Sequence, residues 1–115
     1  MNNNDERRGW ASLELLGKEP GKARHQEIIR LVEHAFEMTL KQIRSPRRDS
    51  RLITPRHILC FLLRRHTNLA LASIGKIVGR DHSSVVHAVS HVEERIERSE
   101  KWREVVGRLE AEITK

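Results

Sequence analysis

The 115-residue sequence predicts a compact all-α domain of five to six helices. Apolar residues recur at intervals of three and four, the spacing of a buried helical face, rather than at the interval of two typical of strands. The sequence has only four aromatic residues, so the core must consist mainly of Leu, Ile, Val and Ala, which suit helices. The length is that of one domain.

Residues 1–20 are expected to form a flexible arm, because they mix Asn, charges, Gly and Pro around one short apolar stretch. From Gly21 the pattern predicts an amphipathic helix. Its predicted apolar stripe consists of Ile28, Leu31, Val32, Ala35 and Phe36. A short second helix through Leu40 and Ile43 should follow, since Thr39 and Gln42 have the spacing of a capping box.

Residues 44–51 predict an exposed basic loop, with four arginines and no apolar side chain to bury. Thr54 and Pro55 then resemble an N-cap followed by proline at the first helical position. The helix that they would open should end near Thr67 and Asn68. Its predicted buried residues are Ile58, Leu59, Leu62 and Leu63, and Cys60 among them is expected to be a core residue rather than a nucleophile.

Two helices joined by a short glycine-containing turn are predicted next, the arrangement called helix-turn-helix. The first spans residues 71–78, and after Gly79 and Arg80 the Asp81 carboxylate can cap the second. The predicted buried face of the second helix consists of Val85, Val89, Val92 and Ile96. Its opposite face carries Ser83, Ser84, His87, Ser90 and His91.

A last helix is predicted within residues 99–115, where Ser99 is the candidate cap. Its apolar residues are Trp102, Val105, Val106, Leu109 and Ile113, which should pack the helix against the rest of the domain. The domain division that follows is an arm over residues 1–20, a helix-turn-helix domain over 21–98 and this C-terminal helix.

The charge distribution indicates a polyanionic partner. Residues 41–92 hold ten basic residues against only Asp49 and Asp81, whereas residues 1–40 and 93–115 each hold six basic and seven acidic residues. A surface that serves only solubility mixes both signs, so nucleic acid is the favoured partner. Residues 82–92 contain no carboxylate, and their hydroxyls and imidazoles can donate to phosphates or base edges.

Other classes of protein are disfavoured by the sequence. No apolar run is long enough to span a membrane, and the N-terminus lacks the apolar region of a secretory signal, so a cytoplasmic location is expected. The single cysteine excludes an internal disulfide. His87 and His91 have a metal-compatible spacing, but contact with solvent or phosphate is favoured over metal binding. Without a carboxylate pair, an activated nucleophile or a phosphate-binding loop, neither an enzyme nor a cofactor is predicted.

The segment Arg80-Asp81-His82-Ser83-Ser84-Val85-Val86-His87-Ala88 resembles the signature Arg-Asp-His-Thr-Thr-Val-x-His-Ala of one family. This is the C-terminal helix-turn-helix domain, domain IV, of the DnaA family of bacterial chromosomal replication initiators. Further similarity lies at Thr67-Asn68-Leu69, at Ile74-Gly75 and at Pro55-Arg56, so the resemblance covers roughly residues 25–98. It implies a Trp-repressor-like, all-helical fold that reads a short duplex site.

The resemblance also implies roles for individual residues. His82 and Ser83 correspond to readers of base edges, Asp81 to a combined cap and base contact, and Ser84 and His87 to contacts with phosphate or the groove wall. Arg48 corresponds to an arginine inserted in the minor groove. The remaining candidates for DNA contact are Arg47, Arg51, Arg56, His57 and His91. Of these, His57 and His91 stand where the family usually has glutamine and lysine.

The sequence therefore predicts a stand-alone DnaA-like protein that binds double-stranded DNA, as a monomer rather than an obligate dimer, in replication initiation or its regulation. The ATPase domain of full-length family members does not fit within 115 residues. An alternative is an interaction module that keeps the fold and serves as adaptor or decoy for a replication protein.

Overall fold

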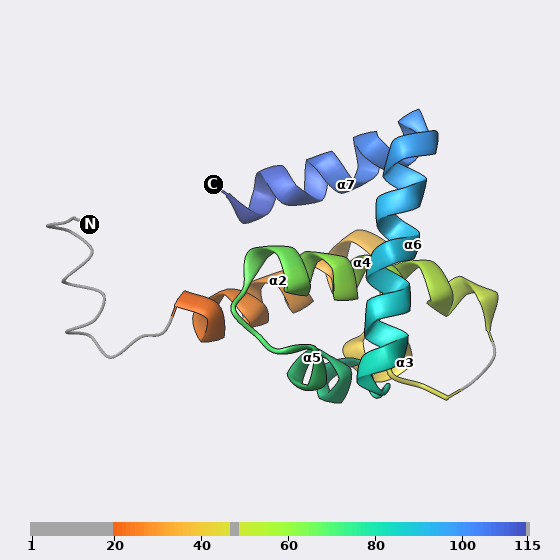
Figure 1. Cartoon of the computed structure of the whole chain (residues 1–115). Helices are drawn as coiled ribbons and strands as arrows, with labels where there is room; N and C mark the ends of the chain where they lie inside the picture. Colours follow the sequence, from red (N-terminus) through yellow and green to blue (C-terminus); the bar gives the residue numbers. More distant parts are fainter. Residues whose placement is uncertain (1–19, 47–48, 115) are drawn as a thin grey trace, which may run out of the picture.

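The computed structural model describes residues 20–46 and 49–114, which form helices joined by short connections (Figure 1). The helices are α2 (Pro20–Phe36), α3 (Leu40–Ile43), α4 (Ser50–His66), α5 (Leu71–Val78), α6 (His82–Arg98) and α7 (Glu100–Ile113). The described ranges contain no strand, so the predicted all-α class is confirmed. Of the predicted arm, only Pro20 lies within the described residues, and it begins α2. None of the described helices combines the length and the apolar character needed to cross a bilayer.

Helix α4 is the centre of the domain, because it packs against each of the other described helices. Six consecutive residues explain this position, since all are at most 2% exposed: Ile58, Leu59, Cys60, Phe61, Leu62 and Leu63. A helix that is apolar on every side must be enclosed by other elements. Burial also raises the pKa of the Cys60 thiol to about 12, which keeps it protonated and supports its predicted core role.

The predicted start of this helix is wrong, because α4 begins at Ser50 rather than at Pro55. The Asp49 carboxylate is the true N-cap and accepts a hydrogen bond from the backbone N–H of Arg51 at 3.0 Å. Leu52, 7% exposed, fastens this first turn to the core. Pro55 therefore lies inside the helix, where it has no N–H to donate to the carbonyl of Arg51.

Helix α2 differs from its predicted stripe at two positions. Ala35 is exposed, and Ile29 is buried beside Ile28 and Val32. The buried side of α2 is thus rotated toward Ile29, because the helix must face α4 and α7 together. The capping box of α3 is confirmed, since the Thr39 hydroxyl accepts from the Gln42 N–H and the Gln42 side chain accepts from the Thr39 N–H.

The predicted helix-turn-helix is formed by α5 and α6, and two glycines shape its turn. Gly79 ends α5 with φ of +72°, a left-handed conformation that glycine adopts without strain. Gly75, inside α5, accepts the Arg80 N–H on its carbonyl at 2.8 Å. A Cβ atom at residue 75 would overlap the carbonyl oxygen of Arg80. The close contact between the turn and α5 therefore depends on Gly75.

Helix α7 folds back over α2 and α4 after the Ser99 hydroxyl caps its first turn (Figure 1). Val106 and Leu109 bury its inner side. Polar contacts fix its far end: His66 Nε2 lies 2.7 Å from Glu110 Oε2, and Arg24 donates to the carbonyl of Ile113 at 3.1 Å. Because α7 is held at several points, it supports the side of α6 that faces the core.

Candidate nucleic-acid interface

The start of α6 is ordered by Asp81, whose Oδ1 accepts a hydrogen bond from the Ser84 N–H at 2.8 Å. This backbone hydrogen bond, aided by the Ser84 hydroxyl and the charge of His82, lowers the pKa of the exposed Asp81 carboxyl. The carboxylate is therefore ionised at neutral pH and stabilises the first-turn amides as a cap. The side chains of residues 82–84, which follow this cap, are all exposed to solvent.

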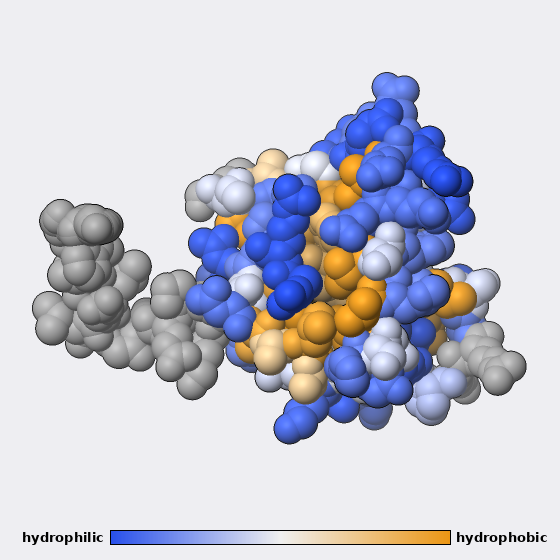
Figure 2. All heavy atoms as spheres, in the orientation of Figure 1, coloured by the Kyte–Doolittle hydropathy of each residue, from blue (hydrophilic) through white to orange (hydrophobic). Residues whose placement is uncertain are grey.

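The exposed side of α6 carries most of the polar residues predicted to be there. Ser83, Ser84, His87 and Ser90 are exposed, while Val85, Ala88 and Val92 are buried against the core. Val89 and Ile96 are only partly buried at the margin of this core. The character of the helix changes at Glu93 and Glu94, which are acidic and exposed. Where the end of α6 meets the start of α7, a strongly hydrophilic corner projects from the molecule (Figure 2).

His91 departs from the predicted exposed face. It is half-buried, and its ring meets the His57 ring edge-on, with centroids 5.0 Å apart, and the Trp102 ring at 6.2 Å. His91 thus lies between α4 and α7 rather than on the outer side of α6. The contact is non-local, so nothing in the sequence pattern of α6 indicated it.

A shallow groove of about 340 Å³ runs between the first half of α4 and the start of α6. It is lined by Arg56, His57, Cys60, Arg80, Ser83, Ser84, Val85, His87 and Ala88. The structure thereby brings together five of the predicted site residues from two segments of the chain: Arg56, His57, Ser83, Ser84 and His87. Asp81 and His82 stand beside this groove without lining it, at the start of α6.

Arg80 also lines the groove, although the sequence analysis did not include it among the candidate site residues, and it shares a hydrogen-bond acceptor with Arg56. Arg80 Nη2 donates to the carbonyl of Ser45 at 3.0 Å, and Arg56 Nη2 donates to the same carbonyl at 3.1 Å. Arg56 also donates to the carbonyl of Ile43 at 2.9 Å, and Arg80 donates to those of Gly79 and Arg44. We call these two side chains the guanidinium bracket. It joins the base of the arginine-rich segment to the helix-turn-helix.

The bracket changes the interpretation of Arg56, which the sequence placed among the DNA contacts. Desolvation and the neighbouring charge of Arg80 lower the pKa of Arg56, so the two cations are held close together in spite of their repulsion. A bound polyanion would relieve this repulsion. Arg80 is the first residue of the segment that resembles the family signature, and this position was the sequence signal that could have identified it as a candidate.

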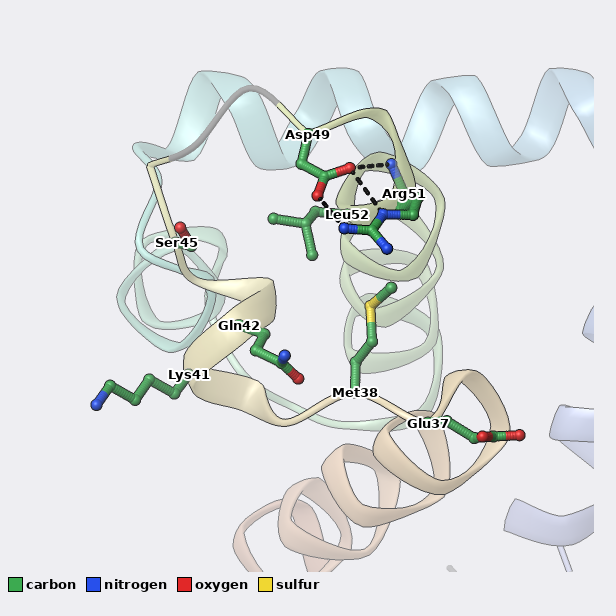
Figure 3. Close-up of a pocket in the computed structure, with 8 residues that line it drawn as sticks. All are labelled: Glu37, Met38, Lys41, Gln42, Ser45, Asp49, Arg51 and Leu52. Carbon is green, nitrogen blue, oxygen red and sulfur yellow. Dashed lines mark hydrogen bonds and ion pairs between the residues drawn. The ribbon is translucent and has the colours of Figure 1, made fainter.

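The arginine-rich segment itself is described only in part. Arg47 and Arg48, both predicted to contact DNA, lie outside the described residues. Arg51 belongs to the first turn of α4 and lines a separate pocket of about 380 Å³ with residues of α3 and of the connection that precedes it, including Gln42 and Met38. Figure 3 shows its guanidinium folded onto Asp49, with Nη2 to Oδ2 at 2.8 Å and Nε to Oδ1 at 3.2 Å. To bind a phosphate, the Arg51 guanidinium would have to release the Asp49 carboxylate.

His57 is a half-buried histidine that lines the groove. Its pKa is lowered to about 4 by burial first, and then by the neighbouring His91, Arg56 and His87. Its Nδ1 atom is buried without a hydrogen-bond partner. His57 is therefore neutral in the folded protein at neutral pH, whereas an unfolded chain takes up this proton near pH 6.5.

This difference predicts that the free energy of unfolding falls as pH decreases from about 6.5 to about 4, since only the unfolded state gains the proton in that window. Because His57 is only half-buried, the loss should be about 1–2 kcal/mol. Urea denaturation at several pH values measures it, and His57→Gln should flatten this part of the profile. His34→Gln, on the exposed side of α2, is the matched control. An unchanged profile in His57→Gln would contradict the assignment.

A metal site is not apparent in the described part of the chain: within residues 20–46 and 49–114, no three His, Cys, Asp or Glu side chains are grouped closely enough to hold an ion. The groove instead combines cationic donors with hydroxyl and imidazole groups. This combination of donors suits phosphate oxygens and base edges.

Comparison with known proteins agrees with the geometry. Residues 25–92 match the family described as "Bacterial dnaA protein helix-turn-helix". The chain is 36% identical over 95 residues to the chromosomal replication initiator protein DnaA of Thermomicrobium roseum, an alignment covering 78% of this chain and 20% of that protein. The DnaA protein of Lachnoclostridium phytofermentans is 35% identical over 83 residues, 71% of this chain and 18% of that protein. The chain thus spans about a fifth of the length of these relatives.

Proposed function

The chain belongs to the bacterial DnaA helix-turn-helix family, and from this premise we propose that it binds a specific site in double-stranded DNA during replication initiation or its regulation. The observation that supports this most is the exposed side of α6 between His82 and Ser90, which has no carboxylate and lies beside the guanidinium bracket. An α-helix with such a face fits the major groove. The role proposed for these residues is binding without ATP hydrolysis, on nucleoid DNA in the cytoplasm.

Each part of the surface has a proposed task. His82 and Ser83 read base edges, Asp81 caps α6 and meets a base, and Ser84 and His87 approach the backbone along the groove. Arg48 enters the minor groove, with Arg47 and Arg51 as backbone contacts. His57 and His91 pack against each other and support the wall of the groove. The unit over residues 21–98 binds as a monomer, and the helix in residues 99–115 braces it.

Selection of bound duplexes from a random pool, followed by titration at several salt concentrations, tests this proposal. With about five phosphate contacts, log K should fall against log salt with a slope near −4.5. A scrambled duplex of equal length is the control for specificity. Equal affinity for both duplexes would reject sequence-specific binding. A flat salt response, or no binding to either duplex, would instead favour an adaptor for a replication protein.

A further inference from the structure

Asp49 is an acidic residue in the arginine-rich segment that is proposed to meet DNA. Only one other acidic residue, Asp81, occurs within residues 41–92. A carboxylate at this position repels DNA phosphates and so weakens the attraction between the protein and any duplex. The capping role of Asp49 does not require this charge, because asparagine and serine cap helices about as well as aspartate. The carboxylate therefore needs a second explanation.

The contacts between Asp49 and Arg51 give this explanation. Oδ1 of Asp49 accepts the backbone N–H of Arg51 at 3.0 Å and its Nε–H at 3.2 Å, and Oδ2 accepts from Arg51 Nη2 at 2.8 Å (Figure 3). The guanidinium and the carboxylate thus meet edge to edge through two side-chain hydrogen bonds, the geometry that arginine also adopts with a phosphate. We call this pair the carboxylate clasp.

The carboxylate clasp is fixed from the side of Asp49. This side chain caps α4 and is 26% exposed, whereas the side chain of Arg51 is 81% exposed. Exposed ion pairs usually contribute little, because two flexible side chains must be ordered, but a two-bonded pair with one partner already fixed loses less entropy. The side-chain hydrogen bond with Asp49, and next its negative charge, raise the pKa of Arg51. Arg51 is therefore a permanent cation whose charge is balanced within the protein.

Arg51 differs in this respect from the guanidinium bracket. Arg56 and Arg80 donate to backbone carbonyls, which are uncharged, so both arginines keep their positive charge toward a duplex. The carboxylate clasp, in contrast, has no net charge. A phosphate can bind the same edge of Arg51 only by displacing Asp49, and the displaced carboxylate then remains close to that phosphate. Both consequences disfavour binding.

We propose that Asp49 is an internal competitor of DNA phosphates for Arg51 and thereby limits the affinity of the protein for duplex DNA. This inference rests on the proposed function, which places Arg51 among the contacts with the DNA backbone. The competition involves a phosphate rather than a base, so it acts on duplexes of every sequence. It keeps binding reversible, since most differences in affinity between related complexes lie in the dissociation rate.

Asp49→Asn tests the proposal, because asparagine can keep the cap but lacks the charge that holds Arg51. Kd for a selected duplex is measured at several salt concentrations for the unaltered protein, Asp49→Asn, Arg51→Ala and the double variant. Asp49→Asn should bind about fivefold more tightly. Its plot of log K against log salt should be steeper by about 0.9, the value for one additional phosphate contact. In the Arg51→Ala background the same substitution should have neither effect.

Glu37→Gln is the matched control for the loss of one negative charge. Glu37 is exposed and lines the same pocket as Asp49 and Arg51, and Figure 3 shows its side chain directed away from the guanidinium. Because salt screens exposed charges, this variant should change Kd by less than about twofold. If Asp49→Asn tightens binding equally without Arg51, or if Glu37→Gln has the same effect, general repulsion is the cause and the proposal is overturned.

The remaining outcomes separate this inference from the proposed function. If the unaltered protein selects a duplex but Asp49→Asn binds it no more tightly, the competition is refuted while DNA binding stands. If no variant binds any duplex, the proposed function fails and the inference fails with it. Asp49→Ser provides a second neutral cap and should give the same result as Asp49→Asn. Thermal melts check both folds, and the variant whose Tm stays nearer to that of the unaltered protein decides.

Discussion

Gly75→Ala is expected to lower the free energy of unfolding by about 3 kcal/mol, the upper part of the range for overpacked sites. The added methyl would overlap the carbonyl oxygen of Arg80, a backbone atom that cannot move aside as a flexible side chain does. Relief requires the turn to separate from α5, which also displaces Asp81 and the start of α6. DNA affinity should therefore fall together with stability. Chemical denaturation and duplex titration measure the two effects.

Gly107→Ala is the matched control for this substitution. Gly107 lies inside α7, and apart from the adjacent residues and backbone of its own helix no described atom lies within 4 Å of the position that its Cβ would take. Glycine is less favourable than alanine in a helix interior, so this variant should gain up to about 1 kcal/mol. Equal stability of the two variants would show that the turn tolerates a side chain at residue 75, against the close contact described above.

Much of the fold could be predicted from the sequence because its signals are local. The caps at Thr39, Asp81 and Ser99 each bind an amide within three residues, so spacing alone identifies them. The start of α4 could not be found in this way, because Asp49 and Thr54 both resemble caps. The burial of Leu52 decides between them, and that depends on the whole core. For the same reason the sequence pattern did not show that Ile29, rather than Ala35, lies on the buried side of α2.

The exposure of the candidate site residues could be predicted where they lie on one helix. The exposed residues at the start of α6 follow from helical periodicity and from the absence of carboxylates. The hydrogen bonds of Arg56 could not be predicted from periodicity, because their acceptors are carbonyls 11 and 13 residues earlier in the chain. The contact between His57 and His91 likewise joins two helices. Guanidinium groups have the same donors for a backbone carbonyl as for a phosphate, and only the fold shows which partner is within reach.

Arg80→Ala is expected to weaken DNA binding about 30-fold, which corresponds to about 2 kcal/mol of binding free energy. Losing hydrogen bonds from a charged donor has a cost of this size. The guanidinium donates to the carbonyls of Ser45 and Gly79 at 3.0 and 2.9 Å and to Arg44 at 3.4 Å. Without it, the base of the arginine-rich segment keeps the hydrogen bonds from Arg56 but loses those from Arg80, and placing that segment against DNA becomes more costly.

A lost phosphate contact would also weaken binding, and Arg80→Lys separates the two explanations. Lysine keeps the charge, but a single ammonium group cannot reach several carbonyls with the planar geometry of a guanidinium. If Arg80 positions the segment, Arg80→Lys should bind nearly as weakly as Arg80→Ala and keep the salt slope of the unaltered protein. Full recovery of affinity in Arg80→Lys would assign Arg80 to charge alone.

Arg48→Ala provides the final discrimination through a double-mutant cycle. If the guanidinium bracket positions the segment that carries Arg48, then Arg48→Ala should cost clearly less affinity in the Arg80→Ala background than in the unaltered protein. The effect should be strongest on duplexes with A·T pairs beside the site, where a narrow minor groove attracts an inserted arginine. Additive losses would show that the two arginines act independently. Coupled losses would mean that the turn of the helix-turn-helix controls how the minor groove is read.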